Sequence, residues 1–262
     1  MLTYLNDIQI RSLAQFTQGQ DWQLQLAHDR PYHLLIWITR GQGVGLLDGL
    51  RRGIGAHNAI FVPAGSLFSL TLGRQSTGQV MMIPDGGNLR LPEIPRLLRI
   101  REVQAQGQLS GLIDAAAREE QMQQPLYRDA LESQAALISV WLRRQIMLED
   151  HVPERRNAAG RLSKKFCESL SERYRKGEVM ADYAAALGVT PTHLSRAVKS
   201  ATGKTAADLL TERILHAARS LLLETDVTAQ SIARFLGFGS AAYFTRFVQQ
   251  HTGQTPSKLR KR

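Results

Sequence analysis

Cysteine is almost absent from this sequence, since Cys167 is the only one among 262 residues. A single cysteine excludes an internal disulfide and any metal site built from several thiolates. Long apolar runs are also missing, because no uncharged stretch approaches the roughly 18 residues that a membrane helix needs. The first residues, Met1–Asp7, lack the basic and apolar segments of a signal peptide. We therefore expect a soluble cytoplasmic protein that has no membrane partner.

Lysine is missing from the first 154 residues, which hold 14 Arg against 15 acidic residues. Residues 155–262 hold 19 Lys plus Arg against 8 acidic residues, so the whole positive excess lies there. A need for solubility explains the net charge well but explains such a one-sided distribution poorly. A near-neutral half joined to a strongly basic half predicts a polyanion partner for the second half alone.

Residues 20–85 contain short strand-like runs that are separated by turn signals. The pair Asp48-Gly49 is typical of a type I′ hairpin, in which both central residues need positive φ. Several short strands at this spacing predict a small barrel or sandwich. The runs are Leu34–Thr39, Val44–Leu47, Ala59–Val62, Phe68–Leu72 and Gln79–Ile83.

Residues 105–149 change to a helical period, with Pro125 between two helices. In the second helix, Leu131, Ala135, Ile138 and Leu142 recur at three- and four-residue steps and form an apolar stripe. Such helices can pack on the barrel or on a second copy of the chain, and the pattern leaves both open. We expect at least one face to form a homodimer contact.

From residue 161 onward the pattern is entirely helical, which gives an α+β fold class. We predict four parts: a sensor barrel at 1–104, a helical dimerisation or packing segment at 105–149, a polar linker at 150–160 and an all-α domain at 161–262.

Two stretches of the C-terminal domain repeat one pattern about fifty residues apart. Each has a short apolar helix, a turn with Gly188 or Gly237, and a second helix that begins after Thr190 or Ser240. These hydroxyl residues are good N-caps, and glycine suits the left-handed end of the first helix. The second turn is one residue longer than the first. Two helix-turn-helix units in the basic half predict a protein that binds double-stranded DNA.

The outward faces of the two second helices suit recognition of base edges. Arginine can bond both O6 and N7 of guanine, and small hydroxyl or methyl groups suit other bases. A solvated surface charge explains one such arginine, but it explains a matched pair poorly. The predicted base-reading residues are Thr192, Ser195, Arg196, Ala241, Ala242, Thr245 and Arg246. Four further basic residues, predicted to contact phosphates, are Lys199, Lys204, Arg213 and Arg219.

The segment from about 163 to 260 resembles the AraC/XylS family of bacterial transcription regulators. The stretches that carry the resemblance are Tyr183–Arg196, Ala217–Asp226, Ile232–Phe238 and Thr252–Pro256. The resemblance implies a seven-helix domain in which a long helix holds both recognition helices, so that they enter successive major grooves about 34 Å apart. It places base reading on the same seven residues. Gln249-Gln250 stand where the family usually has basic residues, so we expect few phosphate contacts there.

Residues 30–85 resemble the cupin-like barrel that is common in this family. In metal-binding cupins a histidine would lie near Phe68, and no His-x-His pattern occurs in the sequence. We therefore expect no metal and no cofactor. A barrel of this size can hold one small-molecule effector. Its predicted lining residues are His33, Trp37, Phe61 and Phe68.

The sequence predicts a regulator of transcription, activator or repressor, that is not an enzyme and lies at the nucleoid. RNA polymerase is an expected partner if the protein activates. Two alternatives remain. One is a DNA-repair alkyl acceptor, which would need a reactive cysteine beside a base, and Cys167 has no such pattern around it. The other is non-specific nucleoid binding by charge alone.

Overall fold

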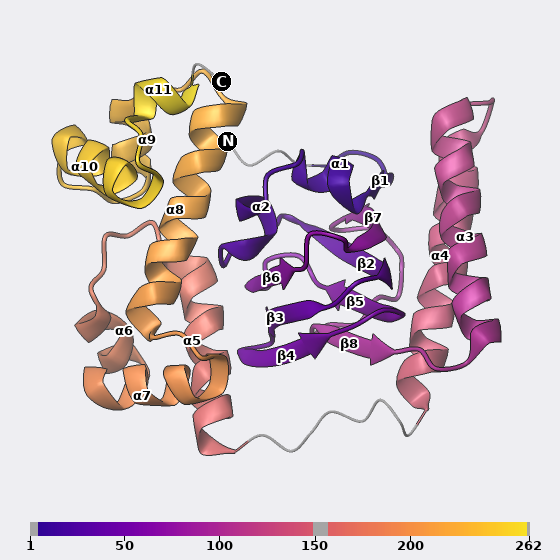
Figure 1. Cartoon of the computed structure of the whole chain (residues 1–262), viewed down its shortest axis with the longest axis horizontal. Helices are drawn as coiled ribbons and strands as arrows, with labels where there is room; N and C mark the ends of the chain where they lie inside the picture. Colours follow the sequence, from indigo (N-terminus) through magenta and orange to yellow (C-terminus); the bar gives the residue numbers. More distant parts are fainter. Residues whose placement is uncertain (1–4, 149–156, 261–262) are drawn as a thin grey trace.

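The structure, a computed structural model, describes residues 5–148 and 157–260. Its N-terminal part contains two antiparallel sheets that face one another (Figure 1). The first has the strand order β1-β7-β2-β5-β8, and the second has the order β4-β3-β6. The strands are β1 (Gln9–Ser12), β2 (Tyr32–Arg40), β3 (Gly43–Leu47), β4 (Leu50–Ile54), β5 (Asn58–Val62), β6 (Phe68–Leu72), β7 (Thr77–Pro84) and β8 (Arg96–Arg99). Two short helices, α1 (Leu13–Thr17) and α2 (Trp22–Gln25), follow β1.

All five predicted strand runs lie inside strands of the structure. The predicted hairpin is also confirmed, since Asp48 and Gly49 have φ of 53° and 71°. The sequence analysis missed β1, β4 and β8. These strands are short, and each lies at the edge of its sheet and contains arginine, so none shows a clear apolar alternation.

Alternation along β2 separates two cores in the N-terminal part. Leu34 and Ile36 face the interior between the sheets, which aliphatic side chains and the Phe68 ring fill. Leu35 and Trp37 face the opposite way and pack under the helices α3 (Val103–Met122) and α4 (Tyr127–Met147). Figure 1 shows this helix pair as one layer beside the barrel. The apolar stripe of α4 therefore covers the chain's own sheet, and a dimer contact here would need another face.

Seven helices make up the part between residues 157 and 260, as the resemblance implied. They are α5 (Ala158–Arg173), α6 (Met180–Ala186), α7 (Pro191–Thr202), α8 (Ala206–Glu224), α9 (Ala229–Phe235), α10 (Ala241–Thr252) and α11 (Pro256–Arg260). The α+β fold class is confirmed. The linker prediction at 150–160 was wrong at its end, because α5 begins at Ala158. Residues 149–156, the rest of that prediction, lie outside the described residues.

The two parts of the chain are docked through α5 and α8, which lie between the barrel and the helix-turn-helix units (Figure 1). Arg213 of α8 is buried and bonds Asp29 at 2.5 Å. Next to this pair, the rings of His28 and His216 stack with centroids 4.0 Å apart. Burial lowers the pKa of each histidine well below the usual value for a histidine side chain. The nearby positive charges of Arg30 and Arg213 lower it further.

Candidate DNA-binding site

The first unit consists of α6 and α7, and local sequence fixes where α7 begins. The Thr190 hydroxyl accepts a hydrogen bond from the His193 N–H at 3.2 Å, and Pro191 occupies the first helical position. Gly188 turns the chain at φ 67°. Leu194 and Val198 are fully buried against the core of the domain. The capped start and the buried face together fix which side of α7 faces outward.

The outward face of α7 carries the predicted base-reading residues. Thr192 and Arg196 are exposed, and Ser195 is half-buried beside them. One helical turn further on, Lys199 is exposed on the same side. Hydroxyl groups, a guanidinium and an ammonium therefore project from one face, as contact with a polyanion requires.

The second unit, α9 and α10, repeats this arrangement. The Ser240 hydroxyl accepts from the Tyr243 N–H at 3.1 Å, and Gly237 turns the chain at φ 77°. The predicted longer turn is confirmed, because residues 236–240 separate α9 from α10 where residues 187–190 separate α6 from α7. The matched positions have matched burial: Ala241, Ala242 and Arg246 are exposed, Thr245 is half-buried, and Phe244 and Val248 are buried.

The longer second turn contains an aromatic cluster that the sequence analysis missed. The Phe238 ring lies 5.7 Å from that of Tyr243, 5.3 Å from that of Phe244 and 5.2 Å from that of Phe247. Tyr243 remains 58% exposed at the position that His193 holds in the first unit. The cluster braces the start of α10, and Tyr243 adds an aromatic group to the outward face. Four aromatic residues within ten positions were the available signal.

Three of the four predicted phosphate contacts have partners within the chain, and the prediction was wrong for Arg213, which is buried. Arg213 is only 2% exposed, pairs with Asp29 and lies 3.7 Å from the Tyr174 ring centroid. The guanidinium of Arg219 lies over the Trp22 ring at 4.4 Å. Lys204 pairs with Glu212 at 2.6 Å.

Arg213 and Arg219 contact the N-terminal part directly, and Lys204 is linked to it through Glu212. Glu212, the partner of Lys204, accepts a hydrogen bond from the Ala27 N–H at 3.0 Å. The three-residue spacing of Arg213, His216 and Arg219 puts them on one face of α8. This spacing was the feature of the sequence that could have predicted a contact between that face and another part of the chain. Of the predicted phosphate contacts, Lys199 alone remains on the outward face of a recognition helix.

The four predicted effector residues do not line one cavity. Trp37 and Phe61 lie in the core under α3 and α4, and Trp37 donates a hydrogen bond to the Ser110 hydroxyl of α3 at 3.0 Å. Phe68 lies on the opposite side, in the packed interior between the sheets. His33 accepts from the Ala64 N–H at 3.1 Å, and partial burial lowers its pKa. Alternation along the strands separates these side chains, so the sequence prediction of one pocket was wrong.

A cavity of about 520 Å³ lies between the barrel and α8 instead. Arg30 and Tyr32 line it from the barrel side, and Ser220 and Glu224 line it from α8. The sequence analysis missed it because its walls come from both domains, almost two hundred residues apart along the chain. Among the described residues, no helix is long and apolar enough to cross a bilayer.

Comparison with known proteins agrees with this geometry. The family model described as "Helix-turn-helix domain" matches residues 183–262, which contain the second unit and all but the first three residues of the first. This segment belongs to the AraC-type helix-turn-helix family. The AraC-type domain thus covers the two recognition helices and the long helix α8 between them.

The chain is also similar to curated proteins. It is 31% identical over 137 residues to the HTH-type transcriptional regulator GlxA of Rhizobium meliloti, covering 49% of this chain and 41% of that protein. It is 32% identical over 72 residues to the bifunctional transcriptional activator/DNA repair enzyme AdaA of Bacillus subtilis, covering 28% of this chain and 34% of that protein. The chain thus spans less than half the length of either relative.

An apo ToxT structure from Vibrio cholerae aligns with 98% of both chains at 13% identity and a TM-score of 0.47. This likeness is too distant to carry a functional argument.

The chemistry of Cys167 does not support alkyl transfer. The side chain is buried in α5, and burial raises the pKa of its thiol to about 12. Because the thiolate is the nucleophile, a buried thiol with a high pKa is unreactive near neutral pH. No group of three His, Cys, Asp or Glu within the described ranges is arranged to hold a metal ion.

Proposed function

We propose that this chain is a sequence-specific regulator of transcription that reads two adjacent major grooves with α7 and α10. The observation that carries the proposal is the matched exposure of Arg196 and Arg246 at equivalent positions of two capped helices, each with a buried inner face. Each guanidinium can bond one guanine in two places, whereas a charge-only contact would not require a repeated side chain at a repeated position.

The test starts from a random duplex pool, from which the full chain selects its preferred sequence. Arg196→Ala or Arg246→Ala should then cost about 1–3 kcal/mol on the selected duplex and little on a random duplex, because the loss removes base contacts. Ser200→Ala, an exposed change on α7, is the matched control. Equal losses on both duplexes would favour non-specific binding. Salt dependence does not separate the two readings, since both involve phosphate contacts.

The selected sequences also test the expected homodimer. Two half-sites at a fixed spacing would support a dimer, because the symmetry of a DNA site follows the symmetry of the protein that binds it. A single asymmetric site would contradict it. The outer faces of α3 and α4 are exposed surfaces for such a contact, and Leu137 of α4 is 53% exposed.

Effector sensing, in this proposal, uses the cavity between the domains rather than the packed barrel interior. Its walls combine apolar groups with arginine and carboxylate side chains, which suits an amphipathic small molecule. Anilinonaphthalene sulfonate is a suitable probe, and its fluorescence should rise with the native chain. Ser220→Trp fills the cavity and should abolish that rise. The same fluorescence with both proteins would rule the cavity out as the site.

A further inference from the structure

The hairpin between β3 and β4 joins the barrel firmly to the DNA-binding domain. The Ser163 hydroxyl of α5 donates to the Gly49 carbonyl at 2.7 Å, and Lys164 lies 3.4 Å from the Asp48 carboxylate. A Cβ added at Gly49 would lie 2.6 Å from the Lys164 Cα, so the turn is in direct backbone contact with α5. The position of β4 relative to the recognition helices is therefore fixed by packing.

Arg51, two residues beyond this turn, lies beside the end of the first recognition helix. β4 is an edge strand whose neighbours include α5 and α7. The Arg51 Cδ lies 3.7 Å from the point where a Cβ on Gly203 would be, and Gly203 caps the C-terminus of α7. Arg51 is exposed, and no acidic side chain of the described residues is within ion-pair distance of it. Its aliphatic stem thus rests on α7 while its charge faces solvent.

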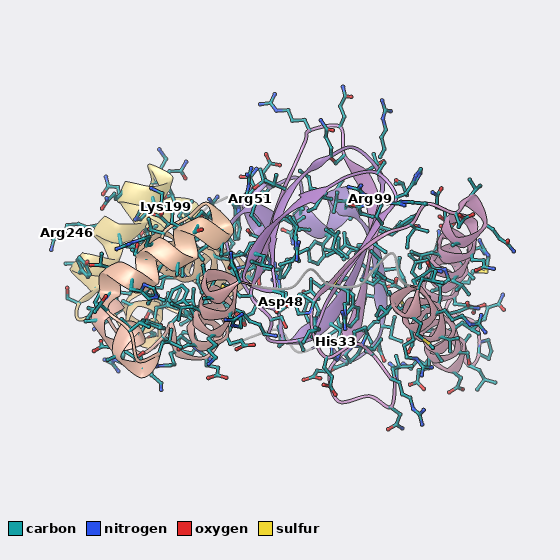
Figure 2. The ribbon with its side chains drawn as sticks, turned by 90° about the horizontal axis from the view of Figure 1, so that it is seen from below. His33, Asp48, Arg51, Arg99, Lys199 and Arg246 are labelled. Atoms are coloured by element: carbon teal, nitrogen blue, oxygen red, sulfur yellow. The ribbon has the colours of Figure 1, made fainter. Side chains whose placement is uncertain are left out.

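The outward row of α7 leads to this arginine. Positions 192, 195 and 196, 199 and 203 follow one face of the helix, since a helix turns once in about 3.6 residues. Gly203, the last position of the row, lies about 10 Å along the axis from Arg196 at a rise of about 1.5 Å per residue. In the view of Figure 2, Lys199 lies between Arg51 and Arg246.

The width of the DNA major groove indicates which part of the DNA would lie near Gly203. A B-form major groove is about 12 Å wide, so a helix that reads its floor reaches the flanking phosphates within about 10 Å. The proposed base contact at Arg196 therefore puts a phosphate strand near Gly203. Arginine pairs with phosphate in a planar, two-bond geometry.

We propose that Arg51 of the barrel contacts the DNA backbone beside the groove that α7 occupies, so that the DNA-binding surface extends beyond the helix-turn-helix domain. This inference rests on the function proposed above. The contact positions the protein without reading bases, and it depends on the docked hairpin. The barrel would thus influence DNA affinity directly, through a charge of its own.

The experiment measures binding of the full chain to the selected duplex and to a random duplex by fluorescence anisotropy at several salt concentrations. Arg51→Ala should weaken binding to both duplexes by about two- to fivefold, as for an exposed ion pair. The slope of log affinity against log salt should fall by about 0.9, the value for one phosphate. Arg99→Ala is the matched control, because Arg99 is an exposed arginine of the same barrel (Figure 2) on β8, in the sheet that α3 and α4 cover. It should change neither quantity.

A double-mutant cycle tests the role of docking. Gly49→Ala drives the hairpin away from α5, and Arg51→Ala should then have little further effect. Ser163→Ala is a milder variant that removes one hydrogen bond, and circular dichroism checks that both variants stay folded. An equal effect of Arg51→Ala in the native and undocked backgrounds would contradict the dependence on docking.

Arg196→Ala separates this inference from the proposed function. If Arg196→Ala loses binding to the selected duplex, the proposed function stands. If Arg51→Ala then behaves like Arg99→Ala, only the proposal that the barrel contacts DNA is overturned. A chain that shows no preference for any duplex would overturn both.

Discussion

The two helix-turn-helix units share a sequence pattern but have different surroundings. The first unit lies beside the barrel, where β4 contacts α7. The second unit has its own aromatic cluster around Phe238. Their turns differ as well: a Cβ on Gly188 would meet nothing within 4 Å, whereas one on Gly237 would lie 2.4 Å from the Gly177 backbone nitrogen. The repeated sequence therefore determines the fold of each unit. The segments that pack against a unit determine how tightly its turn is held.

The largest expected effect comes from weakening the contact between the barrel and α8, the helix that joins the two units. Asp29→Ala leaves Arg213 buried without its carboxylate and should lower the free energy of unfolding by about 3–5 kcal/mol. Chemical denaturation measures the loss, and Asp226→Ala, an exposed acidic position after α8, is the control. Arg213→Leu in the Asp29→Ala background should recover part of the stability. A loss below about 1 kcal/mol would mean that the buried pair does not hold the domains together.

The next effect compares the two turn glycines. Both have positive φ, so alanine at either position should cost about 1–2 kcal/mol of backbone strain. Gly237→Ala also collides with the backbone of Gly177 and should cost about 1–3 kcal/mol more than Gly188→Ala. Urea titrations of the two variants give the difference. Equal losses would show that the second turn can move away from Gly177.

Acid should weaken the contact between the barrel and α8. His28 and His216 are buried as neutral rings, so their pKa is lower in the folded chain than in the unfolded chain. The unfolded chain then binds more protons below about pH 6.5, and stability falls as the pH falls through that value. The free energy of unfolding, measured between pH 5 and 8, should rise with pH.

Replacing the stacked pair isolates its share of that dependence. His28→Phe together with His216→Phe should flatten the curve, whereas His193→Ala, an exposed position on α7, should leave it unchanged. A slope that persists in the double variant would assign the pH dependence to other groups.

The smallest effect concerns matched positions of the recognition helices. Lys199→Ala should weaken binding to selected and random duplexes equally, by about 0.2–1 kcal/mol, because it removes a phosphate contact. Gln249→Ala, at the equivalent place on α10, should change neither, and Gln249→Lys should strengthen both. Electrophoretic mobility shifts on the two duplexes test this. A loss on the selected duplex alone would mean that Lys199 reads a base.

Local sequence predicted most of the fold. The caps at Thr190 and Ser240, the turn glycines and the Asp48-Gly49 hairpin all act between residues a few positions apart, and the structure contains each of them. Apolar spacing also identified which faces of α4, α7 and α10 are buried. The base-reading assignments remain predictions. The repeat implied that these residues are exposed, because an amphipathic helix that buries its apolar side presents its other side to solvent.

Charged and aromatic residues were harder to assign. A basic residue on a helix surface suits water, DNA or another part of the chain equally well, and Arg213 is paired with Asp29 at a separation of 184 residues. The effector prediction failed for a related reason. Aromatic residues of different strands were grouped by type, although Trp37 faces the helices on the outer side of its sheet and Phe68, from the other sheet, faces the interior between the sheets.

The sequence alone determined that the basic half of this protein is a duplicated helix-turn-helix, because hydrophobic period, caps and turns are local properties. Only the tertiary structure decided which basic side chains remain free to meet DNA. Docking buries one face of α8 against the barrel and brings Arg51 to the end of α7. Such contacts join residues that are far apart in the chain, and no short-range pattern encodes them.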